Sequence, residues 1–292
     1  MDKIQLKALA KVNLCLDVLR KREDGYHEVK MVMQTISLCD ELELRRMKQP
    51  GIQVRTNLYY LPTNENNLVY KAADLLMKEF HIRDGVSIQL QKKIPVAAGM
   101  AGGSSDAAAV LWGMNQIYGL GLSRKDLIER GVKLGADVPY CVLRGTALAE
   151  GIGERLKTLP PVPRCYILIA KPGISVSTRF VYESLHANDL KPEQHPDVDA
   201  LIQALKQRDL TLLSSCMGNV LEEVTVPVYP VIDRIKRCMM GAGALGALMS
   251  GSGPTVFGIF DTQGKARKAY HAVKAERLAK QIYLTVPYNV RR

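Results

Sequence analysis

The alternation of apolar and polar positions along the first 60 residues predicts β-strands. Apolar side chains occupy positions 14, 16 and 18, and the same spacing returns at Leu42 and Leu44. The sequence Glu23-Asp24-Gly25 between these runs is typical of a turn. A helical spacing of three or four residues follows over residues 67–80, at Leu68, Ala72, Leu75, Leu76 and Phe80. This segment is therefore expected to be a helix with one buried face.

The rest of the chain mixes further helices and strands. A strand-like run at 86–90 precedes an alanine-rich helix expected over 105–118, and Ser123 with Asp126 forms a capping-box pattern opening a helix that ends at Gly135. In the second half we expect a strand over 165–170, helices near 176–186, 197–207 and 228–240, strands near 246–250 and 254–260, then a helix and a closing strand over 281–286. The order does not alternate strictly between strand and helix, which favours an α+β fold.

The proline-rich stretch Pro160-Pro161-Val162-Pro163 is the best candidate for a domain boundary. With 292 residues, the chain is long enough for two substantial cores. We therefore predict an N-terminal ATP-binding and catalytic domain over 1–160 and a C-terminal substrate-binding domain over 161–292, with roles that follow from the motifs below.

Composition places the chain among ordinary globular proteins, with 47% hydrophobic and 24% charged residues. No apolar run reaches the roughly 20 residues of a membrane span, and the start Met-Asp-Lys is unlike a signal peptide. Six cysteines stand singly, without a Cys-x-x-Cys pair, which argues against a zinc site or a disulfide framework. These features predict a cytoplasmic protein with reduced thiols and no membrane partner.

The net charge of +11 raises the question of a nucleic-acid partner. The basic residues are dispersed, however, and the cluster Arg20-Lys21-Arg22 is followed at once by Glu23-Asp24. A polyphosphate substrate accounts for the positive net charge equally well. We expect no nucleic acid, and a basic nucleic-acid-binding protein remains the remote alternative.

The segment from Pro95 to Asp106 carries the strongest chemical signal. It is a glycine-rich loop, with Gly99, Gly102 and Gly103, that leads into a helix. Glycines let backbone amides approach an anion, and the free amides of a helix N-terminus complete an anion site. The loop lacks the lysine of a Walker A motif and the spacing of a dinucleotide fingerprint. A phosphate-binding loop is the leading hypothesis, and a tight loop with a serine helix cap is the alternative.

A second glycine motif, Gly241-Ala242-Gly243-Ala244-Leu245-Gly246, fits the dinucleotide fingerprint by letter. That fingerprint needs a strand before it and a helix after it. Here a helical pattern precedes the glycines and a strand-like run follows them. A glycine C-cap therefore explains this motif better than a dinucleotide site.

Four segments occur in an order that resembles the GHMP kinase superfamily of galactokinase, homoserine, mevalonate and phosphomevalonate kinases. They are Ala-Lys-Val-Asn-Leu from Ala10 with Asp24-Gly25-Tyr26-His27, the glycine loop, Gly-Ala-Asp-Val-Pro from Gly135, and Ser-Gly-Ser-Gly-Pro-Thr from Ser250. The resemblance covers essentially the whole chain. It implies an α+β, two-domain GHMP kinase fold with the active site in a cleft between the domains.

The resemblance also implies an activity. It points to members that use ATP and Mg²⁺ to phosphorylate the 2-hydroxyl of an erythritol moiety in a cytidine diphosphate-linked polyol, a step of non-mevalonate isoprenoid precursor biosynthesis. The expected enzyme is an ATP-dependent phosphotransferase with an alcohol acceptor, present as a monomer or weak homodimer. Another small-molecule kinase of the family, such as homoserine kinase, is the close alternative.

Catalytic roles carry over to two residues. Asp137 matches the family's catalytic aspartate, suited to accept the proton of the hydroxyl or hold it in line. Lys11 matches the catalytic lysine, whose charge favours an ionised Asp137 and a developing alkoxide. Without the resemblance to the family, Asp137 would be interpreted as a helix-end or turn aspartate and Lys11 as a solvated strand lysine.

The resemblance assigns the remaining site residues. Tyr26 and His27 match the cytidine pocket, with Tyr182 as the aromatic on its other face and Phe180 as the alternative. Ala97 and Ala98 depart from the family by replacing a denser glycine run, which affects the expected path of the loop. The cofactor-binding residues are expected to be Lys92, Pro95, Gly99, Met100, Ala101, Gly102, Gly103, Ser104 and Ser105. The substrate-binding residues are expected to be Asn13, Tyr26, His27, Asp137, Thr178 and Tyr182, with Ser105 as a metal ligand.

Overall fold

Two long strands open the chain where the sequence alternates. In a computed structural model that describes residues 2–290, β1 (Lys3–Lys21) and β2 (His27–Met47) are joined by a short turn. The backbone N–H of Arg22 donates to the carbonyl of Tyr26 at 2.8 Å, and Gly25 has a φ of +84°, which glycine adopts without strain. The expected turn at residues 23–25 is therefore confirmed.

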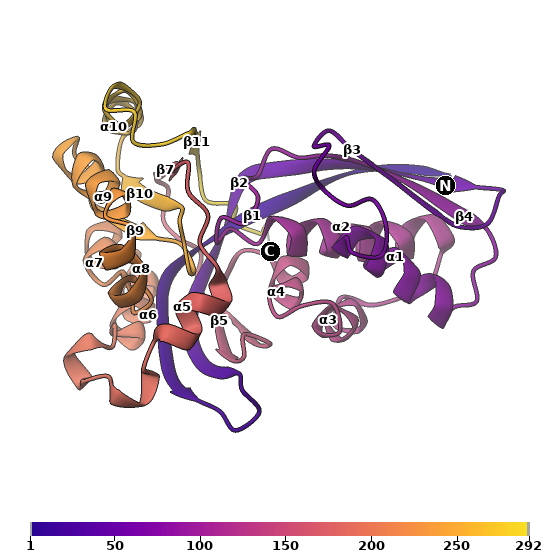
Figure 1. The fold of residues 1–292 in the computed structure, drawn as a ribbon, viewed down its shortest axis with the longest axis horizontal. Helices are drawn as coiled ribbons and strands as arrows, with labels where there is room; N and C mark the ends of the chain where they lie inside the picture. Colours follow the sequence, from indigo (N-terminus) through magenta and orange to yellow (C-terminus); the bar gives the residue numbers. More distant parts are fainter. Residues whose placement is uncertain (1, 291–292) are drawn as a thin grey trace. The chain divides into compact units, whose positions relative to one another are not determined.

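The remaining elements mix helices and strands as expected for an α+β protein (Figure 1). The strands are β3 (Ile52–Thr56), β4 (Gly85–Gln91), β5 (Thr146–Gly151), β6 (Arg155–Thr158), β7 (Tyr166–Lys171), β8 (Gly218–Asn219), β9 (Gly246–Met249), β10 (Val256–Phe260) and β11 (Gln281–Thr285). The helices are α1 (Leu68–Glu79), α2 (Gly102–Tyr118), α3 (Arg124–Val132), α4 (Val138–Leu143), α5 (Thr178–Ser184), α6 (Val198–Gln207), α7 (Leu210–Ser215), α8 (Glu222–Val228), α9 (Val231–Gly241) and α10 (Gln263–Ala275).

The chain divides into two compact units, and β1 and β2 contribute to both. The first unit contains residues 2–10, 38–96 and 101–143. Its sheet has β4 between β3, which is parallel to it, and the second half of β2, which is antiparallel. Helices α1 to α4 lie against one face of this sheet (Figure 1). Apolar side chains such as Leu44, Ile88 and Leu76 form the core between the layers.

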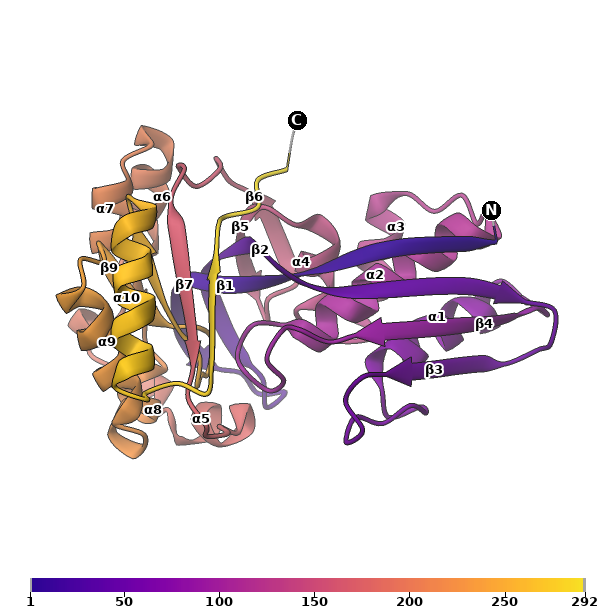
Figure 2. The same ribbon diagram turned by 90° about the horizontal axis from the view of Figure 1, so that it is seen from above.

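The second unit contains residues 11–37, 97–100 and 144–290. Here the first half of β2 pairs with β5, and β8 runs parallel to β1. A separate antiparallel sheet has the strand order β11-β7-β10-β9. Helices α9 and α10 lie along this sheet (Figure 2). Phe257 and Phe260 are fully buried in its core.

Local signals in the sequence explain where several helices begin and end. The Asn67 side chain accepts a hydrogen bond from Val69 N at the start of α1. Ser123 and Asp126 form the expected capping box of α3, although α3 ends at Val132 rather than Gly135. The fingerprint-like glycines follow α9 and precede β9, with φ of +100° at Gly243. Their order of helix, glycines and strand excludes a dinucleotide fingerprint there.

Other elements were not expected from the pattern. Helices α4, α7 and α8 are only six or seven residues long, which is too short to give a clear helical period. The hairpin of β5 and β6 lies before the proline-rich stretch. That stretch, residues 160–163, lies inside the second unit, and the domain limits 1–160 and 161–292 stay a prediction.

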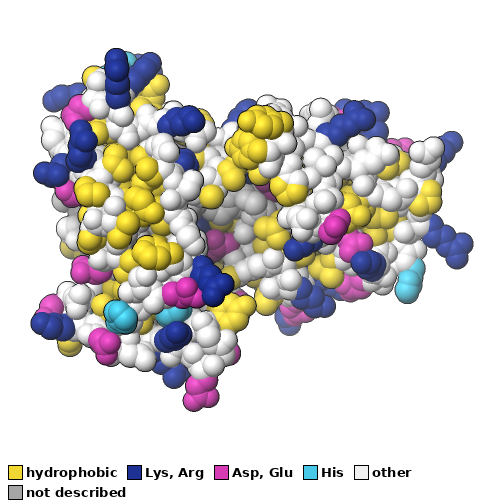
Figure 3. All heavy atoms as spheres, in the orientation of Figure 1, with side chains coloured by type: hydrophobic (Ala, Val, Ile, Leu, Met, Phe, Trp, Pro, Cys, Tyr) yellow, Lys and Arg dark blue, Asp and Glu magenta, His cyan; other side chains and the backbone are white. Residues whose placement is uncertain are grey.

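The surface charges, the thiols and the lengths of the helices bear on the features noted in the composition. Dark-blue basic side chains are scattered among acidic and neutral ones on the face drawn in Figure 3. All six cysteines lie within residues 2–290 and none of them forms a disulfide there, and burial raises the pKa of the Cys15 and Cys165 thiols to about 12. No helix in residues 2–290 has the length and apolar character needed to cross a membrane.

Candidate active site

The glycine loop between β4 and α2 makes repeated left-handed turns. Ala97, Gly99 and Ala101 have φ values of +50°, +70° and +54°. A Cβ atom on Gly99 would lie 2.0 Å from the carbonyl oxygen of Ser250, so only glycine fits that position. Ala97 and Ala101 adopt the left-handed conformation despite the steric cost to an L-residue. Ala97 thus adopts a left-handed conformation although it replaces part of the denser glycine run of the family.

Helix α2 starts earlier than the sequence indicated. Its N-cap is Ala101, and within residues 2–290 no side chain caps this end. The alternative of a serine helix cap is therefore wrong, because Ser104 and Ser105 lie inside the first turn. Ser105 is buried and its hydroxyl donates to the carbonyl oxygen of Leu9 at 2.7 Å. By helix geometry the first backbone amides of α2 lack intrahelical acceptors, which suits this end to an anion.

Lys11 is buried on β1, with 4% of its surface exposed. The interpretation of Lys11 as a solvated strand lysine is therefore wrong. Its Nζ atom lies 2.6 Å from Oδ1 of Asn13, which is also fully buried. The backbone N–H of Lys11 donates to the carbonyl of Met100 at 3.2 Å. The strand that carries both predicted residues thus contacts the glycine loop directly.

Ser250 also links β1 to the glycine loop. It was not among the predicted site residues. Its hydroxyl donates to the carbonyl of Gly99 at 2.9 Å and accepts from the backbone N–H of Asn13 at 3.4 Å. The Asn219 side chain donates to the carbonyls of Met249 and Gly251, each at 2.8 Å. The Ser-Gly-Ser-Gly motif was a signal for Ser250, whereas Asn219 stands in no recognisable motif.

The Asp-Gly-Tyr-His turn carries an aromatic pair. The Asp24 carboxylate accepts the backbone N–H of Tyr26 at 3.1 Å, which orients the turn. The Tyr26 ring is 59% exposed. The ring centroids of His27 and Tyr182 lie 5.2 Å apart at an angle of 48°, whereas Phe180 is 43% exposed. Tyr182 on α5 is thus the aromatic that contacts the Asp-Gly-Tyr-His segment.

His27 has an unused hydrogen-bonding atom. Its Nε2 atom is buried and has no hydrogen-bond partner among residues 2–290. Burial, with a smaller contribution from the charge of Lys21, lowers the pKa of the imidazole below its ordinary value. The ring is therefore neutral near pH 7 and able to donate to or accept from a polar ligand. Thr178 is the first residue of α5, and its hydroxyl oxygen lies 2.8 Å from that of Ser252.

Asp137 lies in the first unit, directly before α4. Its carbonyl accepts the backbone N–H of Cys141 at 3.0 Å, which starts the helix. Asp137 is partly buried. Its position at a helix end agrees with the simple structural interpretation and is equally compatible with the catalytic one.

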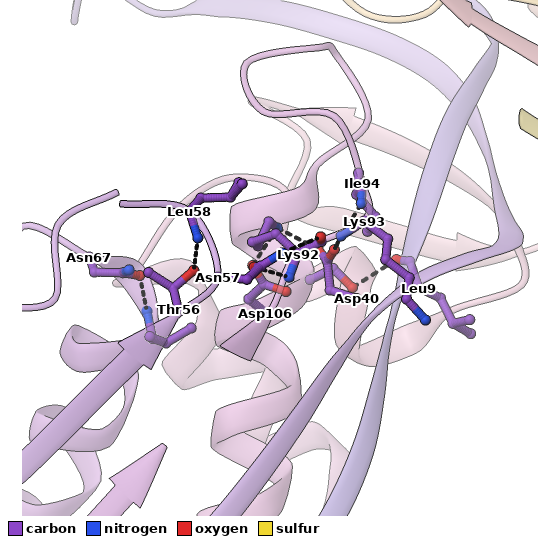
Figure 4. Close-up of polar contacts among 12 residues, drawn as sticks. Leu9, Asp40, Thr56, Asn57, Leu58, Asn67, Lys92, Lys93, Ile94 and Asp106 are labelled. Atoms are coloured by element: carbon purple, nitrogen blue, oxygen red, sulfur yellow. Dashed lines mark hydrogen bonds and ion pairs between the residues drawn. The ribbon is translucent and has the colours of Figure 1, made fainter. Parts of the chain in front are cut away.

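Lys92 lies among two carboxylates (Figure 4). Its Nζ atom forms ion pairs with Asp40 and, at 2.6 Å, with Asp106, and all three side chains are buried. Burial alone would lower the pKa of Lys92, but Asp106 and Asp40 together raise it above its ordinary value. Its ammonium is therefore charged and already engaged, which sequence reasoning did not anticipate.

Comparisons with known proteins identify the family of this chain. Residues 67–145 match the profile of the GHMP kinases N terminal domain, and residues 201–280 match that of the GHMP kinases C terminal. A protein of Lachnoclostridium phytofermentans named 4-diphosphocytidyl-2-C-methyl-D-erythritol kinase is 55% identical, over 98% of this chain and 97% of its own.

Solved structures show the same fold. A crystal structure of 4-(cytidine 5'-diphospho)-2C-methyl-D-erythritol kinase has a TM-score of 0.83 and 33% identity, covering 98% of this chain and all of its own. A homoserine kinase from Cytophaga hutchinsonii has a TM-score of 0.78 and 23% identity, covering 99% of this chain and 96% of its own, which shows the fold alone. The chain belongs to the GHMP kinase family and has its two-domain α+β fold.

Proposed function

We propose that the protein transfers the γ-phosphoryl group of ATP to the 2-hydroxyl of 4-diphosphocytidyl-2-C-methyl-D-erythritol. The relative at 55% identity supports this substrate by its name. The observation that carries the proposal is the pair of His27 and Tyr182, with rings 5.2 Å apart and an unpartnered, buried Nε2 atom among the described residues. An aromatic face and a free edge contact are what recognition of a cytosine ring needs.

The glycine loop is the proposed site of the ATP phosphates. Backbone amides at the start of α2, together with the helix dipole, stabilise negative charge there. Gly102 and Gly103 carry no side chain that would obstruct the approach. Met100, Ala101, Pro95 and Ser104 contribute backbone to the same segment. Asn13 and Thr178 are proposed to contact the polyol or its diphosphate.

Two side chains are proposed to carry the chemistry. The carboxylate of Asp137 accepts the proton of the attacking hydroxyl or holds that hydroxyl in line with the γ-phosphorus. The ammonium of Lys11, oriented by Asn13 at 2.6 Å, stabilises the charge that develops on the attacking oxygen. The active-site cleft that would unite these groups stays a prediction.

Magnesium is proposed to enter with ATP. Kinase sites hold this ion mainly through phosphate oxygens and one or two protein oxygens. Residues 2–290 contain no group of three or more His, Cys, Asp or Glu that could hold a metal ion. Ser105 is the proposed protein ligand, since its hydroxyl gives its proton to Leu9 and keeps oxygen lone pairs. The ion would neutralise charge on the phosphates.

Homoserine kinase activity is the close alternative. It would use the same loop but gives no reason for an aromatic pair and a free imidazole edge. A cytoplasmic location, and a monomer or weak homodimer, belong to the same proposal.

Product analysis by ³¹P NMR tests the proposal directly. The protein is incubated with ATP, Mg²⁺ and either the cytidylated alcohol, homoserine or mevalonate. We expect a new phosphomonoester signal with the cytidylated alcohol alone. Phosphorylation of homoserine or mevalonate, with the cytidylated alcohol unchanged, would overturn the assignment.

A further inference from the structure

The ion pair of Lys92 and Asp106 connects the two ends of the glycine loop. Lys92 follows β4, just before the loop, and Asp106 is the fifth residue of α2, which follows the loop. The two are 14 positions apart in the sequence, and Lys92 Nζ lies 2.6 Å from Asp106 Oδ2 (Figure 4). Lys92 is 8% exposed and Asp106 is 2% exposed. A buried, charge-assisted hydrogen bond is among the stronger polar contacts in proteins.

Separate contacts fix the backbone on the entry side of the loop. The Asn57 side chain accepts from Lys92 N at 2.8 Å and donates to Lys92 O at 3.1 Å. The Asp40 carboxylate accepts the backbone N–H groups of Lys93 and Ile94. Because these contacts fix the backbone at and after Lys92, they fix the direction of its Cα–Cβ bond.

That direction leads to the start of α2. A Cβ atom on Gly102 would lie 3.2 Å from Lys92 Nζ, so the ammonium packs against the first residue of the helix. From there it reaches both Asp40 and Asp106. The side chain of Lys92 therefore contacts the N-terminal end of α2.

The ammonium of Lys92 has two carboxylate partners within this cluster. Two carboxylates share it, and the second oxygen of Asp106, Oδ1, is buried with no hydrogen-bond partner in residues 2–290. Burial raises the pKa of Asp106 well above its ordinary value, and Lys92 offsets only part of that effect. A nucleotide phosphate would have to compete with two buried carboxylates for the same cation.

We propose that Lys92 is a positioning residue that acts through Asp106 to set the spacing between the two ends of the glycine loop, and that it does not contact the nucleotide. This replaces the role in nucleotide binding expected from the sequence. It rests on the proposed function, because it requires ATP to bind at this loop.

A double-mutant cycle on the intact protein tests the proposal. The variants are Lys92→Met, Asp106→Asn and both together, and the measurements are the Kd for ATP and the KM for each substrate. We expect each single change to weaken ATP binding by about 3- to 30-fold, part of the value of a hydrogen bond between charged groups. The KM for the cytidylated alcohol should stay the same. The double variant should bind ATP no more weakly than whichever single variant has the lower affinity, because both changes remove the same interaction.

A direct contact between Lys92 and ATP gives a different result. Asp106→Asn would then leave ATP binding unchanged or improve it, since it frees the ammonium. That outcome, or losses that add in the double variant, would overturn the proposal. If Lys92→Met fails to fold, Asp106→Asn alone decides between the two roles. A general loss of structure would lower kcat through a smaller active fraction and leave the KM for ATP unchanged, and this too would overturn the proposal.

The neighbouring pair provides a matched control. Lys93 and Glu41 form a similar ion pair at 2.6 Å, one residue further along the same segments, but both are exposed. Lys93→Met and Glu41→Gln should change the Kd for ATP by less than about 2-fold, as expected of a screened surface pair. A loss of ATP affinity equal to that of Lys92→Met would show a general effect of charge and would overturn the proposal. Absence of ATP binding by the unaltered protein would instead overturn the proposed function as well.

Discussion

Gly99 packs directly against Ser250, so that a Cβ atom on residue 99 would lie 2.0 Å from the Ser250 carbonyl oxygen. The Ser250 hydroxyl also donates to the Gly99 carbonyl at 2.9 Å. At Gly99 the loop is thus held by contacts that use its backbone alone. This explains a glycine at a position with a φ of +70°.

Gly99→Ala should therefore disturb both stability and nucleotide binding. The left-handed conformation costs an L-residue roughly 1–2 kcal/mol, and overpacking adds a similar amount. We expect the free energy of unfolding to fall by about 2–4 kcal/mol, measured by urea denaturation. ATP binding should weaken in parallel, as followed by calorimetry.

Gly264→Ala is the control for that change. Gly264 lies in the first turn of α10, and within the described residues a Cβ atom there would meet nothing within 4 Å. Alanine in a helix is favoured over glycine by roughly 0.5–1 kcal/mol. The variant should be as stable as the original or slightly more so. Equal destabilisation by the two substitutions would show that crowding at Ser250 is not the cause.

Asp137→Asn tests the proposed chemistry. The change keeps the shape of the side chain and removes its negative charge. Loss of a positioned acid–base group should lower turnover by about 10²-fold or more, while KM values change little. Lys11→Met should also lower kcat, and the double variant should lose less than the product of the two effects, because both groups serve one step. Turnover at the original rate in Asp137→Asn would remove this residue from catalysis.

Local patterns predicted those parts of the fold that depend on neighbouring residues. The apolar spacing over 67–80 identified α1, and Ser123 with Asp126 identified the start of α3, because both signals lie within one or two helical turns. The short helices α4, α7 and α8 lack enough residues for a period to emerge. The start of α2 was placed too late because its cap is Ala101 in a left-handed conformation, which no side-chain preference signals.

Features of the site that depend on distant pairing were not predictable. Lys92 meets Asp40 only because β2 and β4 pair in one register, in which Glu41 faces Gln91. Burial of Lys11 likewise depends on distant segments such as the glycine loop, where the Met100 carbonyl accepts its backbone N–H, and the alternation along one strand does not reveal such contacts. Motifs indicated candidate site residues, whereas contacts between distant segments decide what surrounds them.

Tyr182→Ala tests the proposed base pocket. Stacking of an aromatic ring on a base contributes about 1–3 kcal/mol, so the KM for the cytidylated alcohol should rise by roughly 5- to 150-fold. The KM for ATP should stay near its original value, since the glycine loop binds that nucleotide. Phe180→Ala is the comparison, because Phe180 is on the same helix but 43% exposed. A larger rise for Phe180→Ala than for Tyr182→Ala would move the second wall of the pocket to Phe180.

His27 should make the stability of the protein depend on pH in a defined direction. Burial, and then the charge of Lys21, lowers the pKa of His27 below its ordinary value of 6.5. The unfolded chain therefore takes up the proton at a higher pH than the folded protein does. Between the two pKa values the unfolded state binds more protons, so the free energy of unfolding rises with pH in that window. The stabilisation is complete above about pH 6.5 and is lost as the pH falls toward the folded pKa.

Urea denaturation at pH 7, 6 and 5 measures this effect by comparison with His27→Gln, which cannot take up the proton. The original protein should lose more stability than the variant between pH 7 and pH 5. Lys21→Met should reduce the difference, because it removes the smaller of the two causes and lets the pKa of His27 rise toward its ordinary value. Parallel curves for the original protein and His27→Gln would show that the imidazole is as easily protonated in the folded state as in the unfolded chain. The buried Nε2 atom would then be charged at mildly acidic pH, and the proposed edge contact to a cytosine ring would need a different donor.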